Sequence, residues 1–143
     1  MIYTNLIKKA LKLCYEVHQK QVDKANIPYV FHPFYLAMQM DSEEEIIVAL
    51  LHDVIEDSNY ELNDLIAMGF SQRVVEAVAC LTHNQYLSYD DYIKKISYNE
   101  LAKKVKIADL KHNSNLSRLD EITDDDIRRL NKYKKALEIL LTK

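Results

Sequence analysis

Four ionisable side chains stand close together in the segment His52-Asp53-Val54-Ile55-Glu56-Asp57. His52 and Glu56 are four residues apart, as are Asp53 and Asp57, so on a helix all four crowd one sector. The segment follows an apolar run, residues 46–51, that belongs at the centre of a fold. A divalent cation would offset this buried charge, because it binds imidazole and carboxylate groups. The alternative is a helix end that emerges into solvent with a half-buried histidine.

A further carboxylate stands inside an apolar run, in Val105-Lys106-Ile107-Ala108-Asp109-Leu110. An aspartate in such surroundings needs a cation or several hydrogen-bond donors. Lys106 precedes Asp109 by three residues and could pair with it, so a simple ion pair is the alternative to a metal site. His112 and Asn113 follow Asp109 at spacings that place them on its helical face.

His32 is the third candidate, in a segment of restricted backbone between Pro28 and Pro33. Pro28 disfavours helical geometry at Ile27, and Pro33 suits the first turn of a helix. A single histidine in such a place is more often a structural hydrogen-bonding residue than a ligand. Three unusual segments in one small chain favour a shared site.

The elements that position these residues are predicted to be helices. One glycine and two prolines among 143 residues are very few helix breakers. Apolar periodicity and capping signals predict helices over residues 5–20, 33–40, 43–57 and 62–68, after Ser71, and over residues 88–96, 100–113 and 124–141. We expect one compact all-α domain of seven or eight helices that covers residues 1–143.

Composition restricts the classes of function. The net charge of −3 argues against a dedicated nucleic-acid-binding protein, which would show a basic excess. The apolar runs are too short to cross a bilayer, and no apolar leader follows Met1. Two cysteines make no disulfide framework. We therefore expect a cytoplasmic protein without a nucleic-acid or membrane partner.

Together these segments resemble the HD superfamily of metal-dependent phosphohydrolases, with its histidine, His-Asp pair and distant aspartate. More closely, the chain resembles the small stand-alone RelA/SpoT-type hydrolases of the alarmone (p)ppGpp. The resemblance spans about residues 10–119, and its motifs are in the expected order and spacing. They are His18-x-x-Gln21, Lys24, Pro28-Tyr29-x-x-His32-Pro33, Ala49-Leu50-Leu51-His52-Asp53-Val54-Ile55-Glu56-Asp57 and Val105-Lys106-Ile107-Ala108-Asp109-x-x-His112-Asn113.

The resemblance implies an all-α HD domain and one bound metal ion. The ligands that it implies are His32, His52, Asp53 and Asp109. The family usually uses Mn²⁺, and oxygen ligands mixed with imidazole also suit Fe²⁺ or another divalent cation.

The resemblance also implies roles for residues outside the metal site. Glu56 and Asp57 match the family's acidic pair, which positions and deprotonates the attacking water. Asn113 matches a residue near the ribose and phosphates. Lys24 and Lys106 are the lysines inside motif segments, so we expect them to contact the phosphates of a small nucleotide substrate.

One departure from the family affects the substrate. Asp23 stands where the long enzymes commonly have an arginine that holds the guanine nucleotide. The hypothesis is an Mn²⁺-dependent (p)ppGpp 3′-pyrophosphohydrolase-like enzyme with a metal-activated water. The alternatives are an HD phosphohydrolase that acts on another nucleotide or phosphate ester, and a metal-containing nucleotide-binding regulatory module with little turnover.

Overall fold

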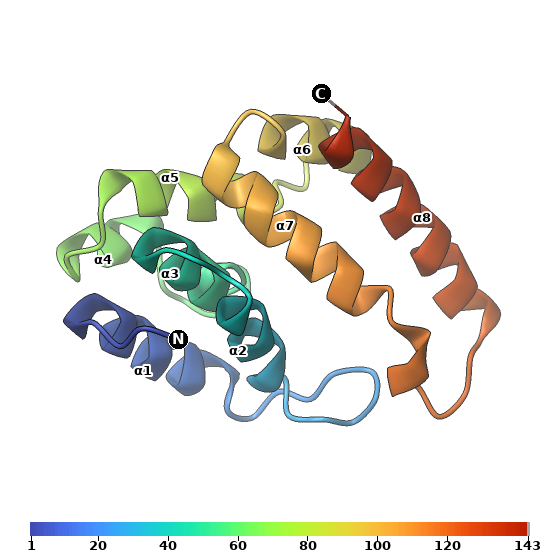
Figure 1. Ribbon diagram of the computed structural model, residues 1–143, viewed down its shortest axis with the longest axis horizontal. Helices are drawn as coiled ribbons and strands as arrows, with labels where there is room; N and C mark the ends of the chain where they lie inside the picture. The colour runs from blue at the N-terminus through green and yellow to red at the C-terminus, as the bar shows by residue number, and fades with distance from the viewer. Residues whose placement is uncertain (143) are drawn as a thin grey trace.

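The computed structural model describes residues 1–142, and its regular structure is helical throughout (Figure 1). Among these residues it forms no β-strand, only an isolated bridge between Val22 and Pro28. The all-α prediction is confirmed. The helices, in chain order, are α1 (Asn5–His18), α2 (Phe31–Met38), α3 (Glu43–Leu51), α4 (Leu62–Ala67), α5 (Gln72–Leu81), α6 (Tyr89–Ile96), α7 (Glu100–Asn113), the short 3₁₀ helix η1 (Leu116–Arg118) and α8 (Asp124–Leu141).

Helix α3 lies at the centre of the core. It packs against α1, α2, α5 and α7, and its six residues from Ile46 to Leu51 are each at most 2% exposed. A capping box of Ser42 and Glu45 begins the helix, because each side chain accepts a hydrogen bond from the other residue's backbone amide. The sequence prediction that this segment is central is confirmed.

Helix α3 is shorter than predicted, since it ends at Leu51 and residues 52–57 form turns. The His52 imidazole Nδ1 lies 2.7 Å from the carbonyl oxygen of Ala49, so the side chain hydrogen-bonds a carbonyl in the last turn. The expectation of one helix face carrying His52, Asp53, Glu56 and Asp57 is therefore wrong. His52 stays buried, whereas Glu56 and Asp57 are exposed.

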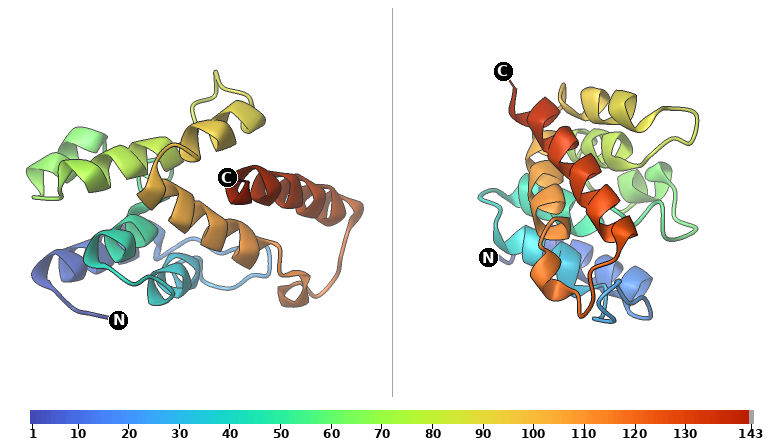
Figure 2. Two further views of the ribbon diagram at one scale, coloured as in Figure 1. Left: turned by 45° about the horizontal axis from the view of Figure 1, so that its top comes forward. Right: turned by 90° about the vertical axis from the view of Figure 1, so that its right-hand side faces the viewer.

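Several segments that are far apart in the sequence come together near the C-terminal end of α7 (Figures 1 and 2). Helix α8 packs against α7 and α6. The loop after α1, η1 and the beginning of α8 come together beside the C-terminal half of α7. In the described part of the chain, no helix is both long and apolar enough to span a bilayer.

Candidate metal centre and adjoining cavity

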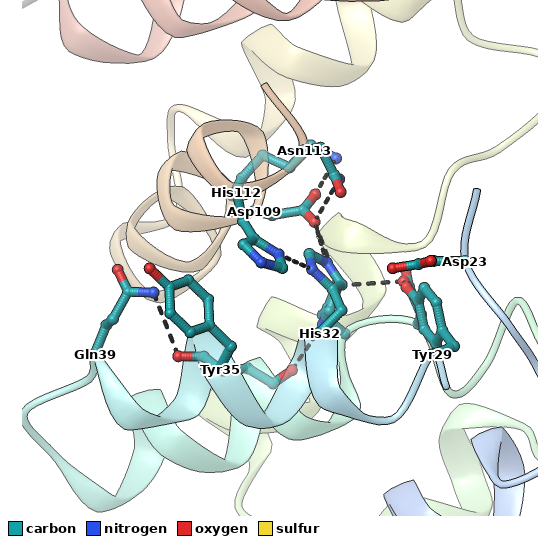
Figure 3. A network of polar contacts seen from close by, with 12 residues as sticks. Asp23, Tyr29, His32, Tyr35, Gln39, Asp109, His112 and Asn113 are labelled. Carbon is teal, nitrogen blue, oxygen red and sulfur yellow. Dashed lines mark hydrogen bonds and ion pairs between the residues drawn. The ribbon is translucent and has the colours of Figure 1, made fainter. Parts of the chain in front are cut away.

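Three buried side chains from different elements converge on one point. They are His32 of α2, His52 just after α3, and Asp109 of α7. Each offers a ligand atom within 4.8 Å of the others, and all three residues are at most 5% exposed. Figure 3 shows His32 facing Asp109 and His112 across the space between α2 and α7. The fold thus brings together three of the four residues predicted to hold a metal.

The orientation of His52 suits a metal ligand. Its Nδ1 is used by the Ala49 carbonyl, which leaves the lone pair of Nε2 facing the cluster. Nε2 is buried and has no hydrogen-bond partner among residues 1–142. An orphaned buried nitrogen is costly, and a cation at this point would satisfy it. The residues present therefore fit a divalent cation.

Asp53, the fourth predicted ligand, lies beside the cluster. Its Oδ2 is 3.2 Å from His52 Nε2, and the same oxygen accepts a hydrogen bond from the Tyr29 hydroxyl. Burial opposes the charge on His52, but the carboxylates of Asp53 and Asp109 outweigh it and raise the pKa of His52 well above its usual value. The two carboxylates thus favour positive charge at this point, and a bound metal ion would take the place of the proton on His52.

Asp109 is held from several sides. His32 Nε2 lies 2.7 Å from Oδ1, Asn113 Nδ2 donates to Oδ1 at 3.1 Å, and Lys106 Nζ donates to Oδ2 at 3.0 Å. Burial opposes its charge, but the Lys106 ammonium and the two histidines keep the pKa of Asp109 well below its usual value. The ion pair that the sequence offered as an alternative is present, and it leaves Oδ1 directed at the histidines.

The Lys106 side chain extends from α7 towards α6 and is largely, but not fully, buried. Its side chain is 15% exposed, and Nζ lies 5.4 Å from the ring centroid of Tyr92. Despite the cost of burial, Asp109 raises its pKa, so the side chain is charged. Since Lys106 already has Asp109 as partner, its predicted contact with phosphate stays a prediction.

The acidic pair lies on the turns after His52. A Glu56 carboxylate oxygen accepts a hydrogen bond from the backbone amide of His83, and an Asp57 oxygen lies 3.8 Å from His18 Nδ1. Burial together with the nearby Asp53 and Asp57 raises the pKa of Glu56, although the His83 amide opposes the shift. A raised pKa suits a carboxylate that accepts a proton near neutral pH.

A cavity of about 460 Å³ adjoins the cluster on the side of the loop after α1. Tyr29 and Asn113 line it and also hydrogen-bond Asp53 and Asp109, so they connect the cavity to the cluster. Lys24 lines it too, and burial and the nearby Arg129 lower the pKa of its ammonium group. Two of the three predicted substrate-binding residues, Lys24 and Asn113, therefore share one cavity.

Three further cavity residues, Arg118, Arg129 and Tyr133, were absent from the sequence prediction. Arg118 is on η1, whereas Arg129 and Tyr133 are one turn apart on α8. Each is an ordinary surface residue in the sequence pattern. Only the spacing of Arg129 and Tyr133, four apart on the last helix, could have suggested that they act together.

Asp23 organises the wall of this cavity. Its Oδ1 accepts hydrogen bonds from the backbone amides of Ala25 at 2.8 Å and Ile27 at 3.0 Å. This turn places Asn26 in the left-handed region with φ of 62°, which asparagine tolerates. Oδ2 lies 3.5 Å from Arg118 Nη1. The aspartate therefore has a structural role in the loop that an arginine at this position could not fill.

Comparison with known proteins finds relatives that are named as guanosine-3′,5′-bis(diphosphate) 3′-pyrophosphohydrolases and others that are named as GTP pyrophosphokinases or diphosphokinases. No family model matches the chain. A guanosine-3′,5′-bis(diphosphate) 3′-pyrophosphohydrolase from Spiroplasma citri is 30% identical over 123 residues, which are 75% of this chain and 16% of the relative. A second, from Aquifex aeolicus, is 32% identical over 87 residues, 58% of this chain and 12% of the relative. A probable enzyme of the same name from Synechocystis is 27% identical over 87% of this chain and 18% of the relative.

A solved structure matches almost the whole fold. It is described as a metazoan ortholog of SpoT that hydrolyses ppGpp; it superposes with a TM-score of 0.80 and covers 99% of this chain and 88% of that one, at 22% identity. The chain resembles the SpoT-type proteins, as predicted. At that identity the superposition shows a SpoT-type fold. The chain spans less than a fifth of the three curated relatives named above.

Proposed function

We propose that this SpoT-type chain is a metal-dependent 3′-pyrophosphohydrolase of ppGpp. The observation that carries the proposal is the junction of two features: the buried cluster of His32, His52 and Asp109, and the cationic cavity that meets it at Asn113. A phosphate ester bound in the cavity has its phosphoryl group beside a cation site. We take ppGpp as the substrate from the relatives that are named as 3′-pyrophosphohydrolases of this nucleotide.

The metal site of the proposal consists of His32, His52, Asp109 and Asp53. Imidazole and carboxylate without a thiolate suit Mn²⁺ or Fe²⁺, and we propose Mn²⁺. When bound, such a cation polarises a phosphoryl oxygen and lowers the pKa of a coordinated water. Contacts within the protein orient two of the ligand atoms towards the metal position, His52 Nε2 and Asp109 Oδ1.

Glu56 and Asp57 take the proton of the attacking water in this proposal. The oxygen of that water forms a new P–O bond, the bond to the 3′ oxygen breaks, and the 3′ oxygen receives a proton. The products are pyrophosphate and guanosine 5′-diphosphate. Glu56 is suited to this work because its carboxylate is held by the His83 amide and its pKa is raised.

The nucleotide occupies the cavity in this proposal. Lys24 contributes a positive charge that has no ion pair among residues 1–142, and Asn113 offers its amide to the ribose or a phosphate. Lys106 acts on the same phosphates through the charge that it adds beside Asp109. The substrate is a small nucleotide, and we propose the cytoplasm as the location.

The deciding experiment is elemental analysis of protein purified without chelators, followed by a Mn²⁺-supported assay with ppGpp. We expect close to one metal ion per chain and release of pyrophosphate. The Asp53→Ala variant should lose metal and activity, and equal activity would contradict the assignment. Metal without ppGpp turnover would redirect the search to other nucleotides. Binding of nucleotide without product release would favour a regulatory module.

A further inference from the structure

The guanidinium group of Arg118 lines the cavity, and contacts within the protein use only part of its hydrogen-bonding capacity. Its Nη1 lies 3.5 Å from Asp23 Oδ2 and 3.4 Å from His112 Nε2, both at the long end of hydrogen-bonding distance. Nε is buried and lacks a protein partner within residues 1–142. A guanidinium carries five N–H donors in a planar fork, so much of this donor capacity is left for a ligand.

The carboxylate that holds Arg118 is itself fixed. Asp23 Oδ1 accepts hydrogen bonds from the amides of Ala25 and Ile27. These bonds fix the carboxylate so that Oδ2 faces Arg118. The Arg118 side chain is 28% exposed, which means that it is packed into the wall and still reachable from the cavity. Ordering of a long side chain before a ligand arrives reduces the entropy lost on binding.

The charges around Arg118 favour an anionic ligand. The cavity is lined by three cationic side chains, Lys24, Arg118 and Arg129, and by two carboxylates, Asp23 and Asp126. Both carboxylates already accept backbone hydrogen bonds, Asp23 within its loop and Asp126 from the amide of Thr123. Arg118 is paired with Asp23 and Arg129 with Asp126, so among residues 1–142 Lys24 is the one of these cations that has no ion pair, and the lining keeps an excess of positive charge for an anionic ligand.

Arg118 also stands close to the metal cluster. Its neighbour His112 lies between it and His32, since the Nδ1 atoms of the two histidines are 2.6 Å apart. One imidazole ring thus separates the guanidinium from a predicted metal ligand. An anion that reaches the cluster from the cavity passes beside Arg118.

We propose that Arg118 binds a phosphate group of the ligand in this cavity and that Asp23 positions it for that contact. The proposal rests on the proposed function for the identity of the nucleotide. Arginine suits this task because its planar fork can donate two parallel hydrogen bonds to one phosphate, which a lysine cannot do.

The test measures binding of inorganic pyrophosphate and of guanosine to the Mn²⁺-loaded chain by calorimetry, together with KM and kcat for ppGpp. Arg118→Gln should weaken pyrophosphate binding and raise KM by about tenfold or more, as expected for lost charge-assisted hydrogen bonds. Arg118→Lys should fall between it and the wild type. Guanosine affinity and metal content should stay unchanged. Arg128→Gln is the matched control, because Arg128 is an exposed arginine paired with Asp125.

Two results would overturn the role of Arg118. One is an Arg118→Gln variant with wild-type affinity for pyrophosphate. The other is a loss shared equally by guanosine, or accompanied by loss of metal, which would mark Arg118 as a structural support of His112. If the wild type fails to hydrolyse ppGpp yet binds pyrophosphate through Arg118, the proposed function fails and the phosphate-binding residue stands.

Discussion

The Nδ1 atoms of His32 and His112 lie 2.6 Å apart, so one proton is held between the two rings. The rings are nearly parallel, at an interplanar angle of 14°. Burial and the neighbouring His32 lower the pKa of His112 to about 4, so His112 is neutral. The contact with His112 fixes the orientation of the His32 ring, whose Nε2 faces Asp109 and the cluster.

Removal of this contact should weaken the metal site. His112→Phe keeps a ring against Tyr35 but leaves His32 Nδ1 without its partner. Loss of such a supporting contact costs roughly 10- to 100-fold in metal affinity. Mn²⁺ titration of metal-free protein measures it. His83→Gln is the control, since His83 lies outside the cluster, and equal affinities in the two variants would contradict the role of His112.

The Lys106–Asp109 pair should be costly to break from one side. Asp109→Asn leaves the buried Lys106 ammonium without its carboxylate, and such a change lowers the free energy of unfolding by about 3 kcal/mol. Lys106→Met combined with Asp109→Asn should recover part of that loss. Urea unfolding of metal-free proteins measures both. Asp90→Asn, which breaks the exposed pair with Lys135, should cost less than about 1 kcal/mol. An additive double variant would argue against coupling.

Loss of the acidic pair should separate catalysis from metal binding. Glu56→Gln keeps an oxygen that accepts the His83 amide, and it removes the carboxylate that would take a proton. We expect kcat for ppGpp to fall roughly 10²- to 10⁴-fold with unchanged metal content. The same should hold for Asp57→Asn. A variant that retains wild-type kcat would exclude that residue as the base.

The capping box of α3 should make stability depend on pH. Burial opposes ionisation of Glu45, but Lys104 and the amides of Asp41 and Ser42 outweigh it and lower its pKa below 4.5. A carboxyl group with a lower pKa in the folded state stabilises the fold above the unfolded pKa, and this contribution is lost as the pH falls through the folded pKa.

Glu45→Gln should therefore be less stable than wild type near pH 7, by on the order of 1 kcal/mol. The difference should shrink as the pH falls well below 4.5. Urea midpoints at pH 7, 5 and 3 measure it, with the exposed Glu121→Gln as control. A difference that is constant over this range would show that the charge on Glu45 contributes nothing.

Much of the fold follows from local signals in the sequence. The serine and threonine caps at Ser42, Ser71 and Thr123 mark helix starts where the structure has them. The end of α3 could not be predicted, because the His52 side chain hydrogen-bonds the Ala49 carbonyl where a regular helix would continue. That contact depends on the position of the imidazole and leaves no trace in apolar periodicity.

The sequence motifs contain the residues that form the buried cluster. His32, His52 and Asp109 come from segments with unusual burial patterns, and the structure brings them together. Arg118 and Arg129 escaped prediction because an arginine in a polar stretch looks like any solvent-exposed residue. They come to line the cavity only when η1 and α8 fold back beside the loop after α1.

The two oxygens of Asp23 have a consequence for how this sequence can change. One oxygen closes the turn at Ala25 and Ile27, and the other holds Arg118. Replacement of Asp23 by an arginine would open the turn and set two guanidinium groups against each other. We therefore expect the effect of a substitution at position 23 to depend on which residue stands at position 118.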